Sequence, residues 1–219
     1  ESNEGKETPH PDPVRFFESA MRMLADVDGF DVIGEAKNGE EALSMARTLR
    51  PNVILMDVKM PGIGGLEATR RIIAGDPEVK IIAVTAISDD IFPERFMSVG
   101  ASGYVTKDAH FDEMIKAIKS VCAGRPYMSA TVAQQLALRT CSRSKTGSPF
   151  EGLSERELQT AIMVANGAKV QSIADSLSIS TKTVNSYRYR IFEKLGVTSD
   201  VELTILALKH KVLDIDGVN

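Results

Sequence analysis

Two apolar runs limit how this chain of 219 residues can fold. "NVILMD" at 52–57 and "VKIIAVTA" at 79–86 are apolar at nearly every position, without the alternation of a half-exposed strand. Strands of this kind are buried on both faces and belong to a parallel sheet that helices cover on each side. Between the two runs, "GLEATRRIIAG" at 65–75 predicts a helix that ends at a glycine. The sequence therefore predicts an α/β domain with a parallel sheet.

Further segments continue this alternation of strands and helices along the chain. Strands are favoured by short apolar runs, and helices by apolar residues that recur every three or four positions. The additional expected strands are 30–36 ("FDVIGEA") and 102–107 ("SGYVTK"), and the additional expected helices are 39–50, 87–101 and 111–124.

Three chemically distinct side chains are expected at the carboxyl ends of the predicted strands. They are Asp57, Thr85 and Lys107. Ligands of open parallel sheets bind outside these ends, so the three side chains should share one pocket. A carboxylate there can carry a phosphoryl group as an acyl phosphate. The lysine and the hydroxyl can bind its oxygens, and the negative charge favours Mg²⁺.

The segments "VILMDVKMPGIGGLEATR", "VKIIAVTA" and "GYVTK" resemble the receiver domain of bacterial two-component response regulators. The resemblance implies a flavodoxin-like (CheY-like) fold with Asp57 as phosphoacceptor. It also implies that Thr85 is the switch hydroxyl and that Lys107 contacts the phosphoryl group. Tyr104 matches an aromatic position that turns inward on activation. The main-chain carbonyl of Lys59 would be a metal ligand.

The beginning of the chain departs from that family. The family opens with an apolar strand and two adjacent acids, whereas this chain has "ETPHPDPVRFF" at 7–17. Asp12 falls on the second acid and Pro11 replaces the first. Because proline cannot donate to a central ladder, the first strand is expected to be absent or distorted. The expected Mg²⁺ ligands are Asp12, Asp57 and Lys59. Two interpretations stay open, a phosphorylated receiver and a degenerate receiver that works only as an interaction module.

A second domain is expected after the linker-like stretch "TCSRSKTGSPFEG" at 140–152. Ser154 followed by Glu157 is the capping-box pattern of a helix N-terminus. A short helix in "KVQSIADSLSI" (169–179) and a longer one that opens at Ser180 or Thr181 follow. Two helices joined by a tight turn, the second with a polar and basic outer face, indicate a helix-turn-helix.

The net charge of −4 does not favour nucleic acid, but residues 182–194 carry four basic residues against the single acid Glu193. On charge alone, a solvated helix of a four-helix bundle is an equal alternative. "LSERELQ", "IADSLSISTKTVNSYRYRIFEKLGV" and "DVEL" are similar to the LuxR/NarL-type helix-turn-helix, which implies binding to double-stranded promoter DNA. By this resemblance, base edges are contacted by Asn185, Ser186 and Tyr189, phosphates are approached by Lys182, Arg188 and Arg190, and Thr183 and Val184 are shared family positions.

The resemblance extends over residues 14–213. It implies a receiver domain at 1–125, a linker with a helical extension at 126–150, a LuxR-type helix-turn-helix domain at 151–213 and a tail at 214–219. "KMPGIGGLEATR" and "KTVNSYRYRIFEKL" look like the GacA/UvrY branch, whose members act with a hybrid sensor histidine kinase. Phosphorylation by such a kinase is expected to uncover the recognition helix and to favour a homodimer. Val201, Leu203 or Leu206 would line the dimer contact.

Other classes of protein fit the sequence less well. No apolar run approaches the roughly 20 residues of a membrane span, and the first residues do not resemble a signal peptide. Cys122 and Cys141 are expected to be free thiols in a reducing cytoplasm. A dehalogenase-type phosphatase also uses a strand-end aspartate, but it needs an acid where this chain has Lys59. The sequence therefore favours a regulator over an enzyme.

Overall fold

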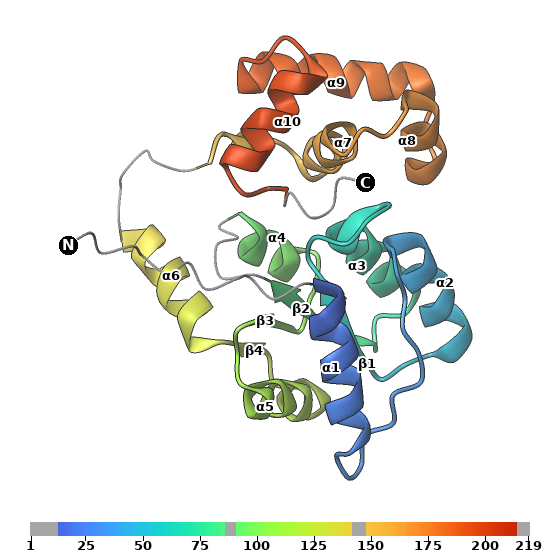
Figure 1. Ribbon diagram of the computed structural model, residues 1–219, viewed down its shortest axis with the longest axis vertical. Coiled ribbons are helices and arrows are strands. Elements are labelled where there is room, and N and C mark those ends of the chain that lie inside the picture. Colours follow the sequence, from blue (N-terminus) through green and yellow to red (C-terminus); the bar gives the residue numbers. More distant parts are fainter. Residues whose placement is uncertain (1–12, 86–90, 142–147, 214–219) are drawn as a thin grey trace, which may run out of the picture.

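The computed structural model in Figure 1 describes residues 13–85, 91–141 and 148–213. The chain forms an α/β unit and, beside it, a unit made of helices alone. Asp12, Asp89, Asp90 and the tail at 214–219 lie outside the described residues. Within the described ranges no helix is both long and apolar enough to cross a membrane.

Four parallel strands form the sheet of the first unit, in the spatial order β1-β2-β3-β4. The strands are β1 (Val53–Asp57), β2 (Lys80–Thr85), β3 (Gly103–Thr106) and β4 (Tyr127–Met128). Three of them confirm predicted strands. The fourth lies beyond residue 125, where the receiver was expected to end.

Alternate side chains of the strands enter two separate apolar cores. Met56, Ile81 and Tyr104 pack on the face that carries α2 (Gly39–Leu49), α3 (Gly64–Gly75) and α4 (Phe92–Ser98). Ile82 and Val105 pack on the opposite face, against α1 (Pro13–Ala25) and α5 (Phe111–Cys122). This two-residue alternation, with apolar residues on both sides, explains why the strands read as continuous apolar runs.

The strand predicted at residues 30–36 does not form, so that prediction is wrong. A strand is held by hydrogen bonds to a neighbouring strand, and β1 pairs only with β2. In the described part of the chain, no strand lies beyond β1 to which residues 30–36 could pair. The helix predicted at 87–101 is confirmed in its described part, where α4 begins at Phe92.

The second unit follows α6 (Ala130–Cys141), the expected helical extension, and a short 3-10 turn, η1 (Pro149–Gly152). Its helices are α7 (Glu155–Ala165), α8 (Val170–Leu177), α9 (Thr181–Leu195) and α10 (Asp200–Lys209). The predicted capping box is confirmed, because Ser154 and Glu157 exchange backbone and side-chain hydrogen bonds. Ser180, not Thr181, caps α9.

Replacing the cap tests how much this local signal contributes to stability. We expect Ser154→Ala to lower the free energy of unfolding by about 1 kcal/mol, because the N–H of Glu157 loses its acceptor. Ser172→Ala, at an exposed position inside α8, is the matched control and should change it little. Urea denaturation monitored by circular dichroism measures both variants. Equal effects would show that the cap is not what holds the start of α7.

Candidate phosphoacceptor site and DNA interface

The sheet brings the three predicted pocket residues to one edge. Asp57 is the last residue of β1, Thr85 is the last residue of β2, and Lys107 directly follows β3. Nζ of Lys107 donates to Oδ2 of Asp57 at 2.9 Å, and both side chains are nearly buried. The backbone N–H of Lys107 donates to the carbonyl of Thr85 at 2.6 Å. The expected convergence at the carboxyl ends of the strands is therefore present.

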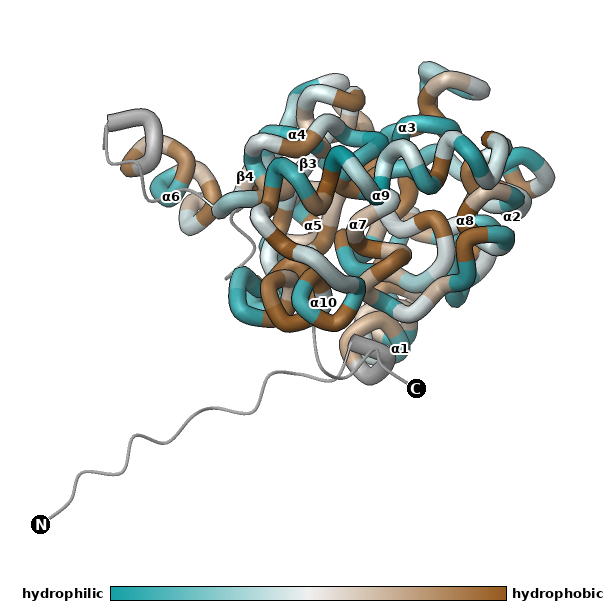
Figure 2. Tube along the Cα trace, turned by 90° about the horizontal axis from the view of Figure 1, so that it is seen from above, coloured by the Kyte–Doolittle hydropathy of each residue, from teal (hydrophilic) through white to brown (hydrophobic). Residues whose placement is uncertain are grey.

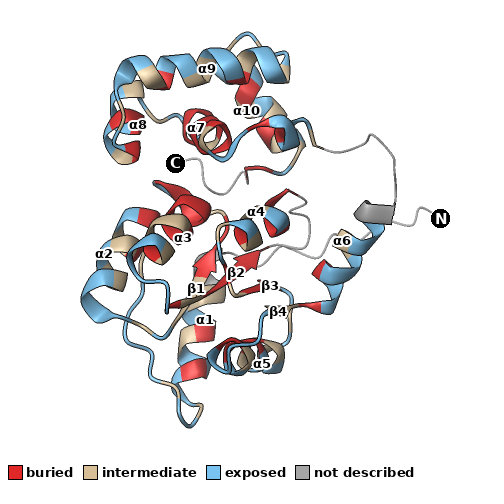
Figure 3. Ribbon diagram, turned by 180° about the vertical axis from the view of Figure 1, so that it is seen from behind, coloured by how far each residue is buried: buried red, intermediate tan, exposed pale blue. Residues whose placement is uncertain are grey.

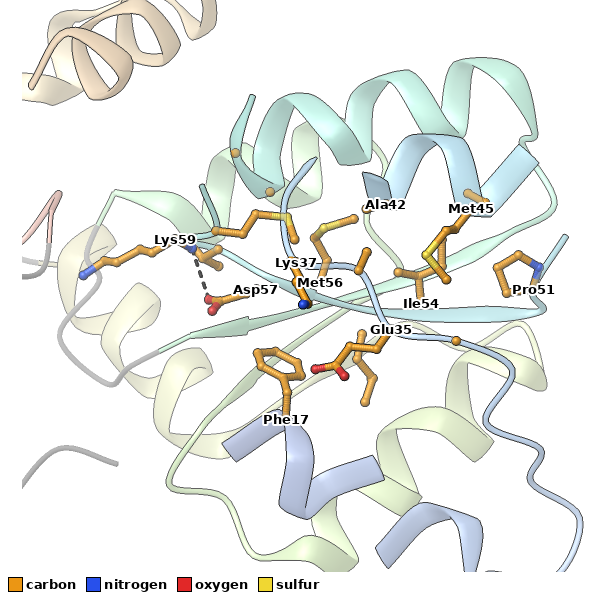
Figure 4. Close-up of a pocket in the computed structure, with 18 of the residues that line it drawn as sticks. Phe17, Glu35, Lys37, Ala42, Met45, Pro51, Ile54, Met56, Asp57 and Lys59 are labelled. Atoms are coloured by element: carbon orange, nitrogen blue, oxygen red, sulfur yellow. Dashed lines mark hydrogen bonds between the residues drawn. The ribbon is translucent and has the colours of Figure 1, made fainter. Parts of the chain in front are cut away.

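Asp57 is held in position from several directions. Its Oδ1 accepts a hydrogen bond from the backbone N–H of Lys59 at 3.1 Å, drawn as the dashed line in Figure 4. Gly65, at the start of α3, packs so closely that a Cβ there would lie 2.0 Å from the carbonyl oxygen of Asp57. The ammonium of Lys107 also lies 5.6 Å from the centre of the Phe17 ring. The hydrogen bond from Lys59 and the ion pair with Lys107 together offset the free-energy cost of burying the Asp57 carboxylate.

Tyr104 is fully buried in this structure. Its ring meets that of Phe96 edge to face, with the centroids 6.1 Å apart. In this conformation the side chain therefore occupies an inward position, and its turn on activation stays a prediction.

The donor set near Asp57 suits a hard cation only in part. In residues 13–85, 91–141 and 148–213, no three His, Cys, Asp or Glu side chains come together as a metal cluster. Asp57 contributes carboxylate oxygens, and the carbonyl of Lys59 is the second expected donor. Mg²⁺ often takes only one or two carboxylates and completes its shell with water and phosphate oxygens, so these residues fit it without forming a complete cage.

The outer face of α9 is open to solvent. Figure 3 shows much of this helix as exposed. The predicted DNA-contacting residues that are exposed are Lys182, Asn185, Ser186, Tyr189 and Arg190. Val184 is instead buried in the core, and Thr183 is half-buried beside the Ser180 cap. Five of the expected contacts thus share one accessible helix face.

Arg188 differs from the other basic residues of α9. Its guanidinium donates to both carboxylate oxygens of Asp200, at 2.6 and 2.7 Å, and lies over the ring of Phe192. It therefore ties α9 to the first turn of α10. Sequence reasoning assigned Arg188 to DNA phosphate and missed Asp200, because the pairing depends on how two helices cross.

The receiver does not cover α9, so the expected masking of this helix is wrong for this conformation. In Figure 1, α9 lies at the side of the second unit that faces away from the sheet. Figure 2, seen from above, colours many residues of α9 as hydrophilic. The contacts with the receiver come instead from η1, α7 and α8.

Arginines dominate the contact between the two units. Glu67 of α3 is buried and binds Arg70 and Arg71 of its own helix and Arg156 of α7, the last at 2.9 Å. Arg71 also donates to the carbonyl of Ser176 in α8 at 3.0 Å. Burial alone would raise the pKa of Glu67, but the hydrogen bonds from Arg70 and Arg71 and the charge of Arg156 hold it below its ordinary value.

Two further side chains join the same surfaces by hydrogen bonds. Arg95 of α4 donates to the carbonyls of Phe150 and Leu153, at 3.1 and 2.8 Å. The side-chain amide of Gln159 in α7 donates to the carbonyl of Ile63. The receiver therefore contacts the second unit through α3, α4 and the turn before α3.

The apolar residues expected at a dimer contact divide into two groups. Leu203 is fully buried in the core, so its assignment to a dimer surface is wrong. Val201 is 68% exposed and Ile205, which was not predicted, is 60% exposed. They lie four residues apart on α10 and hence on one face of the helix. Leu206 is half-buried.

Comparison with known proteins agrees with this arrangement. Residues 12–119 match the response regulator receiver domain, and residues 151–207 match the bacterial regulatory proteins of the luxR family. Response regulator GacA of Pseudomonas aeruginosa is 56% identical over 193 residues, which are 88% of this chain and 90% of that protein. This chain belongs to the LuxR family of two-component response regulators.

Other relatives cover nearly the same length. Response regulator UvrY of Escherichia coli is 49% identical over 86% of this response regulator and 87% of its own length. A solved LuxR-family response regulator from an Aurantimonas species is 35% identical, with a TM-score of 0.56, and covers 59% of this chain and 92% of that one. RcsB of Salmonella typhimurium shares the fold with a TM-score of 0.67 at 22% identity, over 92% of this chain and 94% of that one.

The ionic contact between the units can be tested with two variants of the same cluster. We expect Arg156→Ala to increase the distance between fluorophores placed on α5 and α10, because it removes the cation that α7 presents to Glu67. Arg70→Ala removes a cation from the same carboxylate but within α3, so the distance should stay unchanged. Single-molecule energy transfer measures both.

Lowering the pH should reproduce the effect of Arg156→Ala. Because the folded-state pKa of Glu67 is depressed, its ion pairs are complete above the ordinary glutamate pKa and are lost as the pH falls through the depressed value. If both arginine variants separated the units equally, the contact would not depend on the pair that bridges them.

Proposed function

We propose that Asp57 is the residue of this response regulator that receives the phosphoryl group from a sensor histidine kinase. The observation that carries the proposal is the nearly buried pair of Asp57 and Lys107, 2.9 Å apart at the carboxyl end of the sheet. In the transfer, an Oδ of Asp57 forms a bond to phosphorus while the bond from phosphorus to the histidine nitrogen breaks. The nitrogen keeps the electron pair, and Lys107 stays beside the new negative oxygens.

The neighbouring residues have supporting roles in this proposal. Thr85 would hydrogen-bond a phosphoryl oxygen, and Tyr104 would report the change through its packing in the core. Asp57 and the carbonyl of Lys59 would hold Mg²⁺, together with Asp12, which lies outside the described residues. When bound, Mg²⁺ supplies positive charge to the phosphoryl oxygens. The chain acts as a regulator without turnover, because Lys59 stands where a dehalogenase-type phosphatase needs an acid.

Phosphorylation acts, in this proposal, on pairing and not on access to α9, since the recognition face is already exposed. A phosphoryl group adds a charge of about −1.5 to −2. That charge competes for Lys107 and alters the receiver. A homodimer would then form through the exposed apolar face of α10, at Val201 and Ile205, and present two copies of α9 to a two-fold promoter site.

The proposed domain boundaries separate the phosphorylated receiver from the DNA-binding domain. The receiver expected at 1–125 would extend to Met128, because β4 belongs to its sheet, and the linker with its helix would follow up to residue 150. Residues 151–213 would form the DNA-binding domain and 214–219 a tail. On α9, Asn185, Ser186 and Tyr189 would read base edges and Lys182 and Arg190 would approach phosphates. Thr183 and Val184 would set the position of the helix, and Arg188 would reach DNA only by leaving Asp200. The protein would work in the cytoplasm, where the kinase domain and the promoters lie.

Phosphoryl labelling tests the assignment of Asp57. We expect the wild-type protein, treated with acetyl phosphate and Mg²⁺, to gain the mass of one phosphoryl group, and Asp57→Asn to gain none. Asp108→Asn, an exposed acid next to Lys107, should be labelled normally. Intact-protein mass spectrometry measures all three. Labelling of Asp57→Asn would contradict the proposal, whereas an unlabelled wild type would favour the phosphorylation-independent regulator.

The assignment of α9 to DNA predicts a change in salt dependence. We expect Lys182→Ala to weaken promoter binding and to reduce the slope of log K against log salt by about 1, because one phosphate contact is lost. Lys119→Ala removes an equal charge from the exposed surface of α5 and should leave the slope unchanged. Fluorescence anisotropy over a salt series measures both. Identical slopes in the two variants would exclude Lys182 from the interface.

A further inference from the structure

The ion pair between Arg188 and Asp200 joins the recognition helix to the start of the next helix. Nη2 of Arg188, in α9, donates to both carboxylate oxygens of Asp200, at 2.6 and 2.7 Å. Asp200 is the first residue of α10 and directly follows the Ser199 cap. The side chains of Arg188 and Asp200 are 27% and 49% exposed, so the pair lies at the surface. Because surface ion pairs contribute little to stability, folding alone does not account for this pairing.

The guanidinium of Arg188 is only partly used by its partner. A fork-to-fork pair between an arginine and a carboxylate uses two guanidinium nitrogens, whereas here Nη2 makes both contacts. Nε is buried and has no hydrogen-bond partner among the described residues. The guanidinium carbon lies 5.7 Å from the centre of the Phe192 ring. Asp200 therefore holds Arg188 less firmly than a fork-to-fork pair would.

Arg188 lies beside the face of α9 that is proposed to read base edges. It follows Asn185 by three residues, which makes the two side chains neighbours on the helix surface. An α-helix with its side chains is about 10–12 Å across, close to the roughly 12 Å width of the major groove. A side chain on the flank of an inserted helix consequently meets the phosphates that border the groove.

The other cations of α9 are paired differently. Lys182 and Arg190 are exposed, and no acid in the described ranges binds either of them. Lys194 binds Glu157 of α7 at 2.6 Å, but that carboxylate is buried and belongs to the capping box of its own helix. Arg188 is instead a cation at the edge of the reading face whose charge is met by an exposed carboxylate from another helix.

We propose that Asp200 is a positioning residue that competes with DNA phosphate for Arg188 and thereby lowers the affinity for every DNA sequence. The inference rests on the proposed binding of DNA by α9. In the free protein, the carboxylate neutralises the guanidinium. On DNA, Arg188 reaches a phosphate only by leaving Asp200, which is then unpaired beside a like charge. Because phosphate contacts carry no sequence information, the competition leaves a larger share of the binding free energy to base contacts.

Binding of DNA by the full chain tests this competition. The probe is a labelled duplex of about 20 base pairs, two turns of B-DNA, with an arbitrary sequence, since a phosphate contact needs no promoter. We expect Asp200→Asn to raise the affinity about fivefold to tenfold at about 0.1 M salt, and to steepen the slope of log K against log salt by about 1, because Arg188 is free to bind a phosphate. Fluorescence anisotropy over a salt series measures both quantities.

Removal of Arg188 decides whether the gain arises from this pair. The cost of Arg188→Ala in affinity should be about fivefold larger in the Asp200→Asn background than in the wild type. Because each comparison is made within one background, partial unfolding of Asp200→Asn does not mimic this difference. Glu193→Gln removes an equal charge from an exposed position of α9 and is the matched control. Its effect on affinity should be the same with and without Arg188.

Three results overturn the proposal. Weaker binding by Asp200→Asn would show that the carboxylate orients Arg188 towards DNA. A gain that persists in full after Arg188→Ala would reflect the loss of a negative charge and not the release of a cation. Unchanged affinity and slope in Asp200→Asn would show that the pair does not compete with phosphate.

A second variant distinguishes failure of this inference from failure of the proposed function. If Lys182→Ala weakens binding to the same duplex and Asp200→Asn gives no gain, only the competition is overturned. If Lys182→Ala leaves binding unchanged as well, the assignment of α9 to DNA is wrong, and the competition is overturned with it.

Discussion

The ion pair between Asp57 and Lys107 is the constraint around which the receiver is arranged. The carboxylate and the ammonium lie 2.9 Å apart and are nearly buried, so removing either one would leave an unpaired buried charge and destabilise the fold. The pair requires two non-adjacent strands of a parallel sheet to end at the same edge, and it requires glycine at position 65 so that α3 can approach the carbonyl of Asp57. The chemistry of the site therefore depends on the register of the whole sheet.

The DNA-binding unit is attached to this sheet by charge and not by a continuous apolar surface alone. Glu67 collects three guanidinium groups, one of them from α7, and Arg95 reaches carbonyls of the turn that leads into α7. These contacts leave α9 exposed, because they are made by α7 and α8, the helices that pack against α9. In the described part of the chain, the receiver thus contacts the helices that support α9, and not α9 itself.

Sequence reasoning succeeded where neighbours along the chain decide the structure. The capping box of Ser154 and Glu157, the helix caps and the continuously apolar strands are local signals, and the strand ends placed Asp57, Thr85 and Lys107 correctly. Prediction from the sequence failed where a residue or strand far away along the chain determines the structure. Residues 30–36 have a strand-like pattern but lack a neighbouring strand, and Arg188 binds Asp200 because two helices cross. Leu203 faces the core although its helix is apolar on several sides.

The exposure of α9 in the docked conformation has a consequence for gene control. A regulator that exposes its reading surface in this conformation can sample promoters before any signal arrives, at an occupancy set by how many copies the cell holds. If phosphorylation acts on pairing, as proposed, the signal would change how long two copies stay together on a site, and not whether one copy can touch it. The basal level of transcription would accordingly depend on how much of the protein is present, whereas the maximal induced level would depend on the rate of phosphorylation by the kinase.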